Sequence, residues 1–308
     1  MKQIFHIFSI FSLILLLGSC QKEEQLRISF TGDVLLDRGV RKEIERKGID
    51  FLFEDVAPIF HTSDAVVINL ECPITDTISP IHKKYIFRAD SEWTSALSKN
   101  GVTHAALANN HSMDQGRRGL ESTYYHLINS GITPLGYGKN QTSACQPTLF
   151  SKNGIEVALF NSVLLPLENW VYLEDKPGVC QATIEDLCSE IRQLKKKNSA
   201  CYVLVVLHWG VEYQQEPTLQ QRREARQLID AGADGIIGHH PHVIQKEEIY
   251  KNKPIFYSLG NFIFDQSTPS TTKSVIVELV FGKKDFTYIK KEVKIEACKP
   301  IVSVFVKQ

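Results

Sequence analysis

Residues 202–208, Tyr-Val-Leu-Val-Val-Leu-His, and residues 235–242, Gly-Ile-Ile-Gly-His-His-Pro-His, flank a helix-period segment at Thr218–Ala231. Both flanking runs begin as short, nearly continuous apolar stretches, which is typical of strands covered on both faces of a sheet. Thr218 is a suitable N-cap for the segment between them, and Gly232 is a suitable stop. The stretch therefore predicts a strand–helix–strand unit with histidines at both strand ends, which favours an α/β fold.

The same alternation extends outward through most of the chain. Apolar runs predict strands at Leu26–Thr31, Ala65–Asn69, Val102–Leu107, Ile155–Phe160, Tyr202–Leu207, Gly235–Ile237 and Pro254–Ser258. Helix-period segments lie at Arg38–Lys47, Ser91–Lys99, Gly116–Ser130, Ile184–Lys196 and Thr218–Ala231. Ser91 is a second candidate N-cap, and Gly101 and Gly131 are further candidate stops. The pattern predicts a largely parallel or mixed sheet.

After Gly260 the pattern changes to strands alone. These are predicted at Ser274–Phe281, Phe286–Ile295 and Ile301–Val306, and we expect this tail to close a second sheet against the first. No internal repeat and no clear linker divides the chain, so we expect a single domain over residues 26–308.

The composition fits a globular protein, because 43% of the 308 residues are hydrophobic and 23% are charged. The 35 lysines and arginines balance the 35 aspartates and glutamates. A chain without excess positive charge has no general field for a phosphate backbone, so we expect no nucleic-acid partner.

The first residues are typical of an export signal. The apolar stretch Ile4–Leu17 is too short for a comfortable membrane span but suits a signal peptide. It ends in Leu17-Gly18-Ser19-Cys20, which resembles the bacterial lipobox, where the cysteine is lipid-modified and becomes the new N-terminus. We predict a signal peptide at residues 1–19, lipidation of Cys20 and a tether at residues 20–25. An uncleaved anchor or a buried helix is the alternative.

The predicted location is the bacterial cell envelope, with the protein held on a membrane by its lipid. The tether contains Gln21-Lys22-Glu23-Glu24, which is similar to the Lys-acidic-acidic tag of some surface lipoproteins. This similarity favours the outer membrane or the cell surface over the inner membrane.

Six cysteines remain after Cys20 and include no Cys-x-x-Cys pair; they are Cys72, Cys145, Cys180, Cys188, Cys201 and Cys298. In an exported protein they could form disulfides, but their wide scatter fits buried small side chains equally well.

Polar residues follow six of the predicted strands, in Thr31-Gly32-Asp33, Asn69-Leu70-Glu71, Ala108-Asn109-Asn110-His111, His208-Trp209-Gly210, Gly238-His239-His240-Pro241-His242 and Ser258-Leu259-Gly260-Asn261. Each segment alone has a structural explanation, such as a turn, a loop cap or a core histidine. The carboxyl ends of strands in an α/β sheet form its ligand crevice, so these segments are expected to converge. Their mixed nitrogen and oxygen donors suit zinc, manganese or iron better than calcium.

Seven motifs carry a family resemblance: Gly32-Asp33-Val34-Leu35-Leu36-Asp37-Arg38, Asn69-Leu70-Glu71-Cys72-Pro73, Phe87-Arg88-Ala89, Ala108-Asn109-Asn110-His111-Ser112-Met113-Asp114-Gln115-Gly116, His208-Trp209-Gly210-Val211-Glu212-Tyr213, Gly238-His239-His240-Pro241-His242-Val243 and Ser258-Leu259-Gly260-Asn261-Phe262. In order and spacing they resemble the CapA, or poly-γ-glutamate capsule biosynthesis, family of the calcineurin-like metallophosphoesterase superfamily. The resemblance spans about residues 26–270. It implies a four-layer αββα sandwich of two mixed sheets flanked by helices.

The resemblance also implies one or two divalent ions, of manganese, zinc or iron, at the strand ends. The implied metal ligands are Asp33, Glu71, Asn110, His208, His240 and His242, with His239 as an alternative to His240. His111 would be the proton donor or would contact the phosphate, and Asp114 would orient its ring. Arg38 and Arg88 are candidates to bind an anionic substrate, with a structural ion pair as the alternative for each.

Two positions depart from the superfamily pattern. Typical metallophosphoesterases open with Asp-x-His, but this chain has Leu35 in place of the histidine, and it has Glu71 where aspartate is usual. A site that lacks one ligand should bind its second metal more weakly.

Two functional classes remain. In the first, the protein is a hydrolase or transferase acting on a phosphoester or a γ-linked glutamate polymer, with a metal to activate water and His111 to protonate the leaving group. In the second, it is a non-catalytic accessory protein that binds or exports capsular polymer. His111 with Asp114 favours the enzyme over the accessory protein, because a pure binder has little need of a proton donor, and the number of polar motif residues disfavours a third possibility, a degenerate scaffold. The expected partners are the anionic polymer or phosphoester, the membrane through the lipid anchor, and capsule-synthesis proteins.

Overall fold

A computed structural model describes residues 25–166 and 173–303. The predicted signal peptide, Cys20 and all of the tether except Gln25 therefore lie outside the described residues, as does the end of the predicted strand Ile301–Val306. Within the two described ranges, no helix is both long enough and apolar enough to cross a membrane.

The larger sheet has eight strands within the described residues. Its order is β16 (Lys299–Val302), β15 (Phe286–Glu296), β14 (Lys273–Phe281), β1 (Leu26–Val34), β2 (Ala65–Leu70), β3 (His104–Ala106) and β4 (Thr133–Leu135), and β13 (Asn261–Ile263) also pairs with β1. Strands β1 to β4 are parallel, whereas β14 to β16 are antiparallel to their neighbours. The sheet is therefore mixed.

The second sheet has six strands in the same part of the chain. Its order is β11 (Glu248–Tyr250), β12 (Lys253–Phe256), β10 (Gly235–His239), β9 (Tyr202–His208), β7 (Ile155–Val163) and β6 (Thr148–Lys152). Its four central strands are parallel and its two edge strands are antiparallel. A small ribbon of β5 (Tyr137–Gly138) and β8 (Gly178–Val179) lies apart from both sheets.

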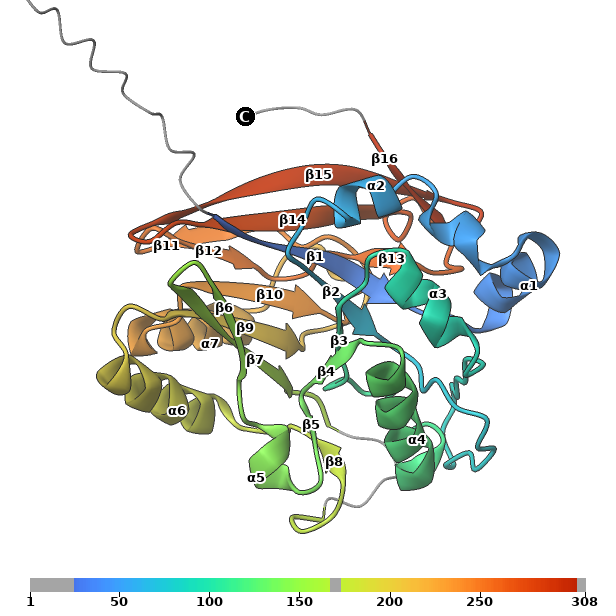
Figure 1. Ribbon diagram of the computed structural model, residues 1–308, viewed down its shortest axis with the longest axis horizontal. Coiled ribbons are helices and arrows are strands. Elements are labelled where there is room, and N and C mark those ends of the chain that lie inside the picture. The colour runs from blue at the N-terminus through green and yellow to red at the C-terminus, as the bar shows by residue number, and fades with distance from the viewer. Residues whose placement is uncertain (1–24, 167–172, 304–308) are drawn as a thin grey trace, which may run out of the picture.

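The two sheets pack face to face, and helices cover their outer faces (Figure 1). One buried apolar cluster joins the sheets through side chains such as Ile28 and Val67 of the first and Leu204 of the second. The outer face of the first sheet carries η1 (Ile49–Phe53), α1 (Arg38–Lys47), α2 (Ala57–Phe60), α3 (Trp93–Lys99) and α4 (Gly116–Asn129). The outer face of the second carries α6 (Ile184–Lys197) and α7 (Leu219–Ala231). The predicted four-layer αββα sandwich is confirmed.

The local signals of the strand–helix–strand unit are also confirmed. Thr218 accepts a hydrogen bond from the backbone of Gln221, whose side chain bonds back to Thr218, and Gly232 ends α7 with φ of 118°. The prediction for Ser91 is wrong, because its hydroxyl donates to Asp76 and α3 begins two residues later. Helix α3 instead has Glu92 at its N-cap without a capping side-chain bond.

The prediction for the C-terminal tail needs correction. Strand β14 pairs with β1, and β15 and β16 follow it, so the tail extends the first sheet. The second sheet is built from the middle of the chain. Four strands of the two sheets were missed, namely β4, β6, β11 and β13, and so was the ribbon of β5 and β8. Three of the four have only three residues, and β4 contains Pro134, which the edge of a sheet tolerates.

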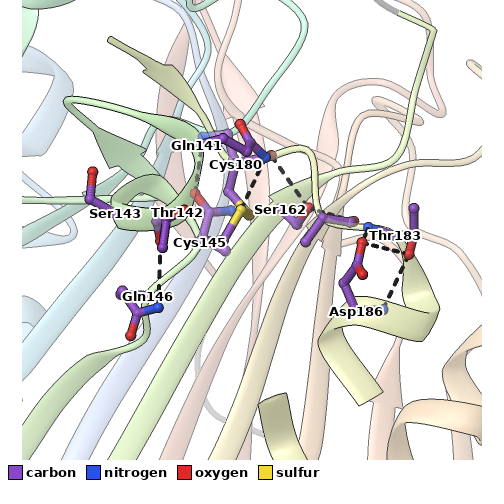
Figure 2. The surroundings of a disulfide bond; sticks show 12 residues. Gln141, Thr142, Ser143, Cys145, Gln146, Ser162, Cys180, Thr183 and Asp186 are labelled. Atoms are coloured by element: carbon purple, nitrogen blue, oxygen red, sulfur yellow. Dashed lines mark hydrogen bonds between the residues drawn. A yellow bond between two sulfur atoms is a disulfide. The ribbon is translucent and has the colours of Figure 1, made fainter. Parts of the chain in front are cut away.

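One pair of cysteines forms a disulfide. Cys145, at the end of α5 (Gln141–Ala144), is bonded to Cys180, which follows β8 (Figure 2). Cys72, Cys188 and Cys201 are buried free thiols, and Cys298 is a partly buried one. Both alternatives considered for the cysteines therefore occur in the same protein.

Candidate metal centre

The strands of both sheets end at one polar site. Asp33 lies near the end of β1, where the pairing with β2 and β13 shifts in register. Such irregularities re-aim side chains at functional sites. Glu71 directly follows β2, and both carboxylates are fully buried. Gly32 is required here, because a Cβ at this position would lie 2.1 Å from the carbonyl oxygen of Gly260.

The second sheet supplies histidines. His208 is the last residue of β9, while His240 and His242 follow β10. His240 has φ of 99° and His242 has φ of 59°. Positive φ is costly for residues other than glycine, and such strain concentrates where the surrounding structure fixes a functional geometry.

Asp33, Glu71 and His242 form the tightest group. Among the described histidines, cysteines and acidic residues, these three can bring one ligand atom each within 4.8 Å of one another. His242 Nδ1 lies 3.2 Å from Asp33 Oδ2, and His242 Nε2 lies 3.6 Å from Glu71 Oε1. Asn261 Oδ1 lies 2.9 Å from His242 Nδ1 and helps to fix the ring.

Asn110 and His208 bring a further pair of donor atoms together. Asn110 Oδ1 lies 2.9 Å from His208 Nε2. The His208 ring lies 4.9 Å from that of His240, which in turn lies 6.1 Å from the His242 ring. All six residues implied as metal ligands therefore belong to one connected cluster.

The position of His239 bears on the alternative to His240. His239 Nε2 bonds the carbonyl oxygen of Thr31 at 2.9 Å. The His240 ring instead lies between those of His208 and His242. Each histidine retains a buried Nδ1 without a hydrogen-bond partner. A backbone bond from one ring nitrogen is also typical of a metal-binding histidine, so both His239 and His240 keep a nitrogen that can bind an ion.

The charges of the cluster are strongly coupled. Burial alone would lower the pKa of His242, but the charges of Glu71 and Asp33 raise it to about 9. Burial and the Asp33 carboxylate raise the pKa of Glu71 well above its usual value. Burial opposes ionisation of Asp33 too, yet the hydrogen bond and charge of His242 lower the pKa of this carboxyl. Two acids and a cationic imidazole thus share one buried volume.

The remaining imidazoles are in the neutral form that binds metals. Burial and then the charge of His242 lower the pKa of His240 to about 3. Burial and the neighbouring imidazoles lower the pKa of His208 well below its usual value. Neutral imidazole is the form that coordinates an ion.

Unpartnered polar atoms show that the site fits a divalent cation. Asp33 Oδ2 and Glu71 Oε1 are buried and share one imidazole, that of His242, at 3.2 and 3.6 Å, while Nδ1 of His239 and of His240 are buried without a hydrogen-bond partner. Buried polar groups are nearly always satisfied, so two carboxylates that share one ring and two imidazole nitrogens without a partner fit a site for a cation. The donor set of carboxylates, an amide and neutral imidazoles matches manganese, zinc or iron.

Asn69 is a residue that sequence reasoning missed. Its Nδ2 donates to Asp33 Oδ1 at 2.8 Å and to Glu71 Oε2 at 3.3 Å, and it lies 3.4 Å from His208 Nδ1. Asn109 supports it with a 3.4 Å hydrogen bond to its Oδ1. Asn69 stood inside one of the quoted motifs, two residues before Glu71, but nothing in its residue type distinguishes a bridging amide from the end of a strand.

His111 and Asp114 lie together as expected. His111 Nδ1 lies 2.8 Å from Asp114 Oδ2, and Asp114 is fully buried. The ring of Phe87 stacks on His111 with centroids 4.2 Å apart. Burial lowers the pKa of His111, while the hydrogen bond to Asp114 opposes that shift. Asp114 is therefore placed to fix the tautomer with the proton on Nδ1.

The two arginines have protein partners. Arg38 forms a two-pronged ion pair with Asp265 and lies over the rings of Phe87 and Phe264, at 5.2 and 5.6 Å from their centroids. Arg88 donates to the carbonyl oxygen of Thr75 and lies 3.1 Å from Asp90.

For Arg88, these contacts favour the structural ion pair over a role in substrate binding. Arg38 stays closer to the site, because Phe87 stacks on His111 and Phe264 packs against His242 at 4.9 Å.

Leu35 occupies the position where the superfamily has a histidine. Its side chain is fully buried in the apolar cluster between the first sheet and its helices. The side chain therefore serves the core, and this position supplies no ligand.

Two mixed sheets enclosed by helices, with a polar cluster where their strands end, define the fold class of the metallophosphatases. The family model for the bacterial capsule synthesis protein PGA_cap matches residues 27–266. The chain belongs to this family, and the predicted resemblance is confirmed.

Named relatives agree with this membership. The chain is 36% identical over 259 residues to the PGA biosynthesis protein CapA of Bacillus subtilis, covering 83% of this chain and 68% of the relative. It is 33% identical to the capsule biosynthesis protein CapA of Bacillus anthracis, covering 84% of this chain and 64% of that protein. It is also 30% identical to a probable polyglutamine synthesis accessory protein of Mycobacterium tuberculosis, covering 80% and 69%. The chain thus spans about two thirds of the length of these relatives.

Solved structures agree in fold. A putative 5'-nucleotidase from Staphylococcus aureus superposes with a TM-score of 0.53 at 13% identity, covering 92% of this chain and 56% of that one. The NAD nucleotidase of Haemophilus influenzae superposes with a TM-score of 0.52 at 11% identity, covering 93% and 61%. At these identities the similarity concerns the fold alone.

Proposed function

We propose that this chain is a metal-dependent hydrolase or transferase that acts on an anionic polymer or phosphoester in the biosynthesis or processing of capsule or poly-γ-glutamate. The observation that carries the proposal is the buried cluster in which Asp33 and Glu71 share the His242 ring and His240, with an unpartnered Nδ1, lies between His242 and His208. Such an arrangement is costly in a protein that has no use for a cation.

The ion would be held by the two sheets together. Asp33, Glu71 and Asn110 would supply oxygen ligands, and His208, His240 and His242 would supply nitrogen ligands. A bound divalent ion supplies Lewis-acid polarisation of a phosphoryl or carbonyl oxygen. Asn69 would keep both carboxylates oriented through its amide hydrogens.

His111 would transfer the proton. With its Nδ1 proton donated to Asp114, Nε2 is the nitrogen free to give a proton to a leaving group. Burial lowers the pKa of His111 in the free protein. An anionic substrate beside the ring would favour the imidazolium, so substrate binding and proton donation would be coupled.

The names of the relatives support the substrate class. Those from the two Bacillus species are named for PGA or capsule biosynthesis. For this chain we propose either a γ-linked glutamate polymer, whose amide carbonyl would be attacked, or a phosphoester. Capsule-synthesis proteins are the proposed partners.

A non-catalytic accessory role is the second candidate. It is favoured by Leu35, which replaces a ligand and packs in the core, and by the accessory function in the name of the Mycobacterium tuberculosis relative. In this role the metal would hold the polymer without cleaving it.

We also propose that Cys20 carries the lipid that anchors the protein at the cell envelope. The sequence Leu17-Gly18-Ser19-Cys20 supports this, and the Cys145–Cys180 disulfide fits a protein that folds outside the cytoplasm. Membrane fractionation tests this proposal. Cys20→Ala should remove the protein from the membrane fraction, whereas Cys298→Ala should not.

The decisive experiment is elemental analysis of the full chain purified in detergent, with hydrolysis assays on a generic phosphoester and on poly-γ-glutamate in added manganese or zinc. Near-stoichiometric metal with turnover of either substrate would support the enzyme and choose its chemistry. Metal without turnover would favour the accessory role. No metal in the wild type, or the same metal content in His208→Ala, His240→Ala and wild type, would refute the site.

A further inference from the structure

Lys83 is a buried cation that the proposed chemistry does not use. It lies in the segment between β2 and α3, and its side chain is only 3% exposed. In the sequence it stands in His82-Lys83-Lys84, which is typical of a solvated surface. Burying an ammonium group is costly unless it is paired and hydrogen-bonded, so this position needs a reason.

The contacts of its ammonium group are with His111, the proposed proton donor, and with the residues that surround it. Lys83 Nζ donates to the carbonyl oxygen of Asn110 at 2.7 Å and to Asp114 Oδ1 at 3.1 Å. The same nitrogen lies 3.3 Å from His111 Nδ1. An ammonium group has three N–H donors. Two of them bond protein oxygens, while the third faces His111 Nδ1, which carries the proton donated to Asp114 and therefore does not accept it.

We propose that Lys83 is a positioning residue, which holds the Asn110 backbone and the His111–Asp114 pair in the geometry needed for proton transfer. This inference rests on the proposed function of the site and deepens it. It assigns a role to a side chain that is neither a candidate metal ligand nor a candidate proton donor.

The hydrogen bonds of Asp114 explain how Lys83 would act. Asp114 Oδ2 accepts from the Phe87 backbone and lies 2.8 Å from His111 Nδ1. Only Oδ1 is left for Lys83, so the two oxygens are held by different elements and the carboxylate cannot rotate. The Phe87 ring, stacked on His111, limits tilting of the imidazole.

Lys83 also connects the proton donor with the candidate metal ligands. It fixes the carbonyl group of Asn110, whose side-chain oxygen lies 2.9 Å from His208 Nε2. Supporting contacts of this kind typically change activity by about 10–100-fold when removed. The distance between a metal held near His208 and the Nε2 atom of His111 would therefore depend on Lys83.

The test compares Lys83→Met with wild type in the full-length protein. We expect kcat to fall about 10–100-fold, with KM and metal content within twofold of wild type, and we expect Lys83→Arg to recover part of kcat. Lys84→Met is the matched control, because Lys84 is the exposed neighbour and lies over Tyr85. A kcat of Lys83→Met within twofold of wild type would overturn the proposal.

A second readout does not depend on turnover. The proton between His111 Nδ1 and Asp114 should give a downfield proton NMR signal, assigned by its absence in His111→Ala. We expect this signal to shift or broaden in Lys83→Met and to persist in Lys84→Met; an unchanged signal would refute positioning even if the wild type proved inactive. If Lys83→Met does not fold, Lys83→Gln, which keeps an N–H donor, is measured in the same way.

Discussion

The two sheets contribute different chemistry to the same site. The first sheet and its loops present oxygen atoms, from Asp33, Glu71 and Asn110. The second sheet presents nitrogen atoms, from His208 and from His240 and His242 beyond β10, the latter two held at positive φ. Oxygen ligands alone suit magnesium or calcium, whereas the mixed set suits manganese, zinc or iron.

The proposed choice of metal would therefore depend on how the sheets pack. The apolar cluster between them, which includes Phe30 of β1 and Val206 of β9, sets their separation. Charge follows the same division. The first-sheet side brings the carboxylates, and the second brings imidazoles; at His208 and His240, burial favours the neutral form of the ring. The oxygen ligands of the first sheet and the nitrogen ligands of the second meet at the contacts of His242 with Asp33 and with Glu71.

The largest expected effect comes from His111, the one candidate imidazole on the first-sheet side. His111→Ala should lower kcat by about 10²–10⁴-fold, because general acid catalysis contributes that much. Metal content should not change, since the ligands are elsewhere. The measurements are steady-state kinetics and elemental analysis, with His61→Ala as the exposed-histidine control. Loss of metal in His111→Ala would move this residue into the ligand set and contradict the division between the sheets.

Sequence reasoning worked where the signal is local. The apolar runs at Tyr202–Leu207 and Gly235–Ile237, and the capping pattern at Thr218, each depend on a few neighbouring residues. The joint placement of polar segments at strand ends also located the cluster that the structure assembles, although the metal-binding roles stay predictions.

Sequence reasoning failed where the residue or strand that makes the deciding contact lies far along the chain. Whether the strand at Ser274–Phe281 joins the first sheet or a second one depends on its pairing with β1, which no local pattern encodes. Lys83 was overlooked because a run of lysines usually marks solvent, and its burial depends on the carboxylate of Asp114. Asn69 was overlooked because its importance arises only when Asp33 and His208 come within reach.

The next largest effect concerns stability. The flank of the second sheet carries the Cys145–Cys180 bridge, whereas Cys72, in the cluster on the first-sheet side, is a free thiol. Replacing both bridged cysteines by serine should lower the free energy of unfolding by about 3–4 kcal/mol, because the bridge closes a loop of 35 residues in the unfolded chain. Urea denaturation measures this. The single variant Cys298→Ser, at a partly buried free thiol, is the control; an equal loss there would show that the bridge has no special role.

Asn69 tests whether the ligands of the two sheets are oriented together. Asn69→Ala removes the amide that joins Asp33, Glu71 and His208 while leaving every candidate ligand in place. Metal affinity should fall by about 10–100-fold, as for other supporting residues of metal sites. Calorimetric titration with zinc and manganese measures it, against Asn129→Ala at the exposed end of α4. Unchanged affinity would mean that each sheet orients its own ligands.

The smallest effect lies at a contact between the sheets that carries no metal. The His104 ring, in β3, packs against Phe150 of β6 with centroids 4.6 Å apart. Burial lowers the pKa of His104 from 6.5 to about 4. Because its folded pKa is depressed, the unfolded chain binds more protons between these values. The contribution of His104 to the free energy of unfolding therefore has its full value above pH 6.5 and is lost as the pH falls towards 4. We expect a loss of about 2 kcal/mol, a figure that allows for the ring's partial contact with water.

His104→Phe isolates this term. The variant keeps an aromatic ring against Phe150, and Thr103, which bonds His104 Nδ1, retains its hydrogen bonds to Val66. The difference in unfolding free energy between pH 7.5 and pH 4.5 should therefore be smaller in His104→Phe than in wild type, with both proteins in chelator so that the metal ligands titrate alike. Equal pH dependence in the two proteins would mean that the sheets admit water at His104. The pH dependence that remains in His104→Phe then belongs to the other titrating groups, chiefly the buried acids and imidazoles of the candidate metal centre. There, opposite charges rather than apolar side chains join the sheets.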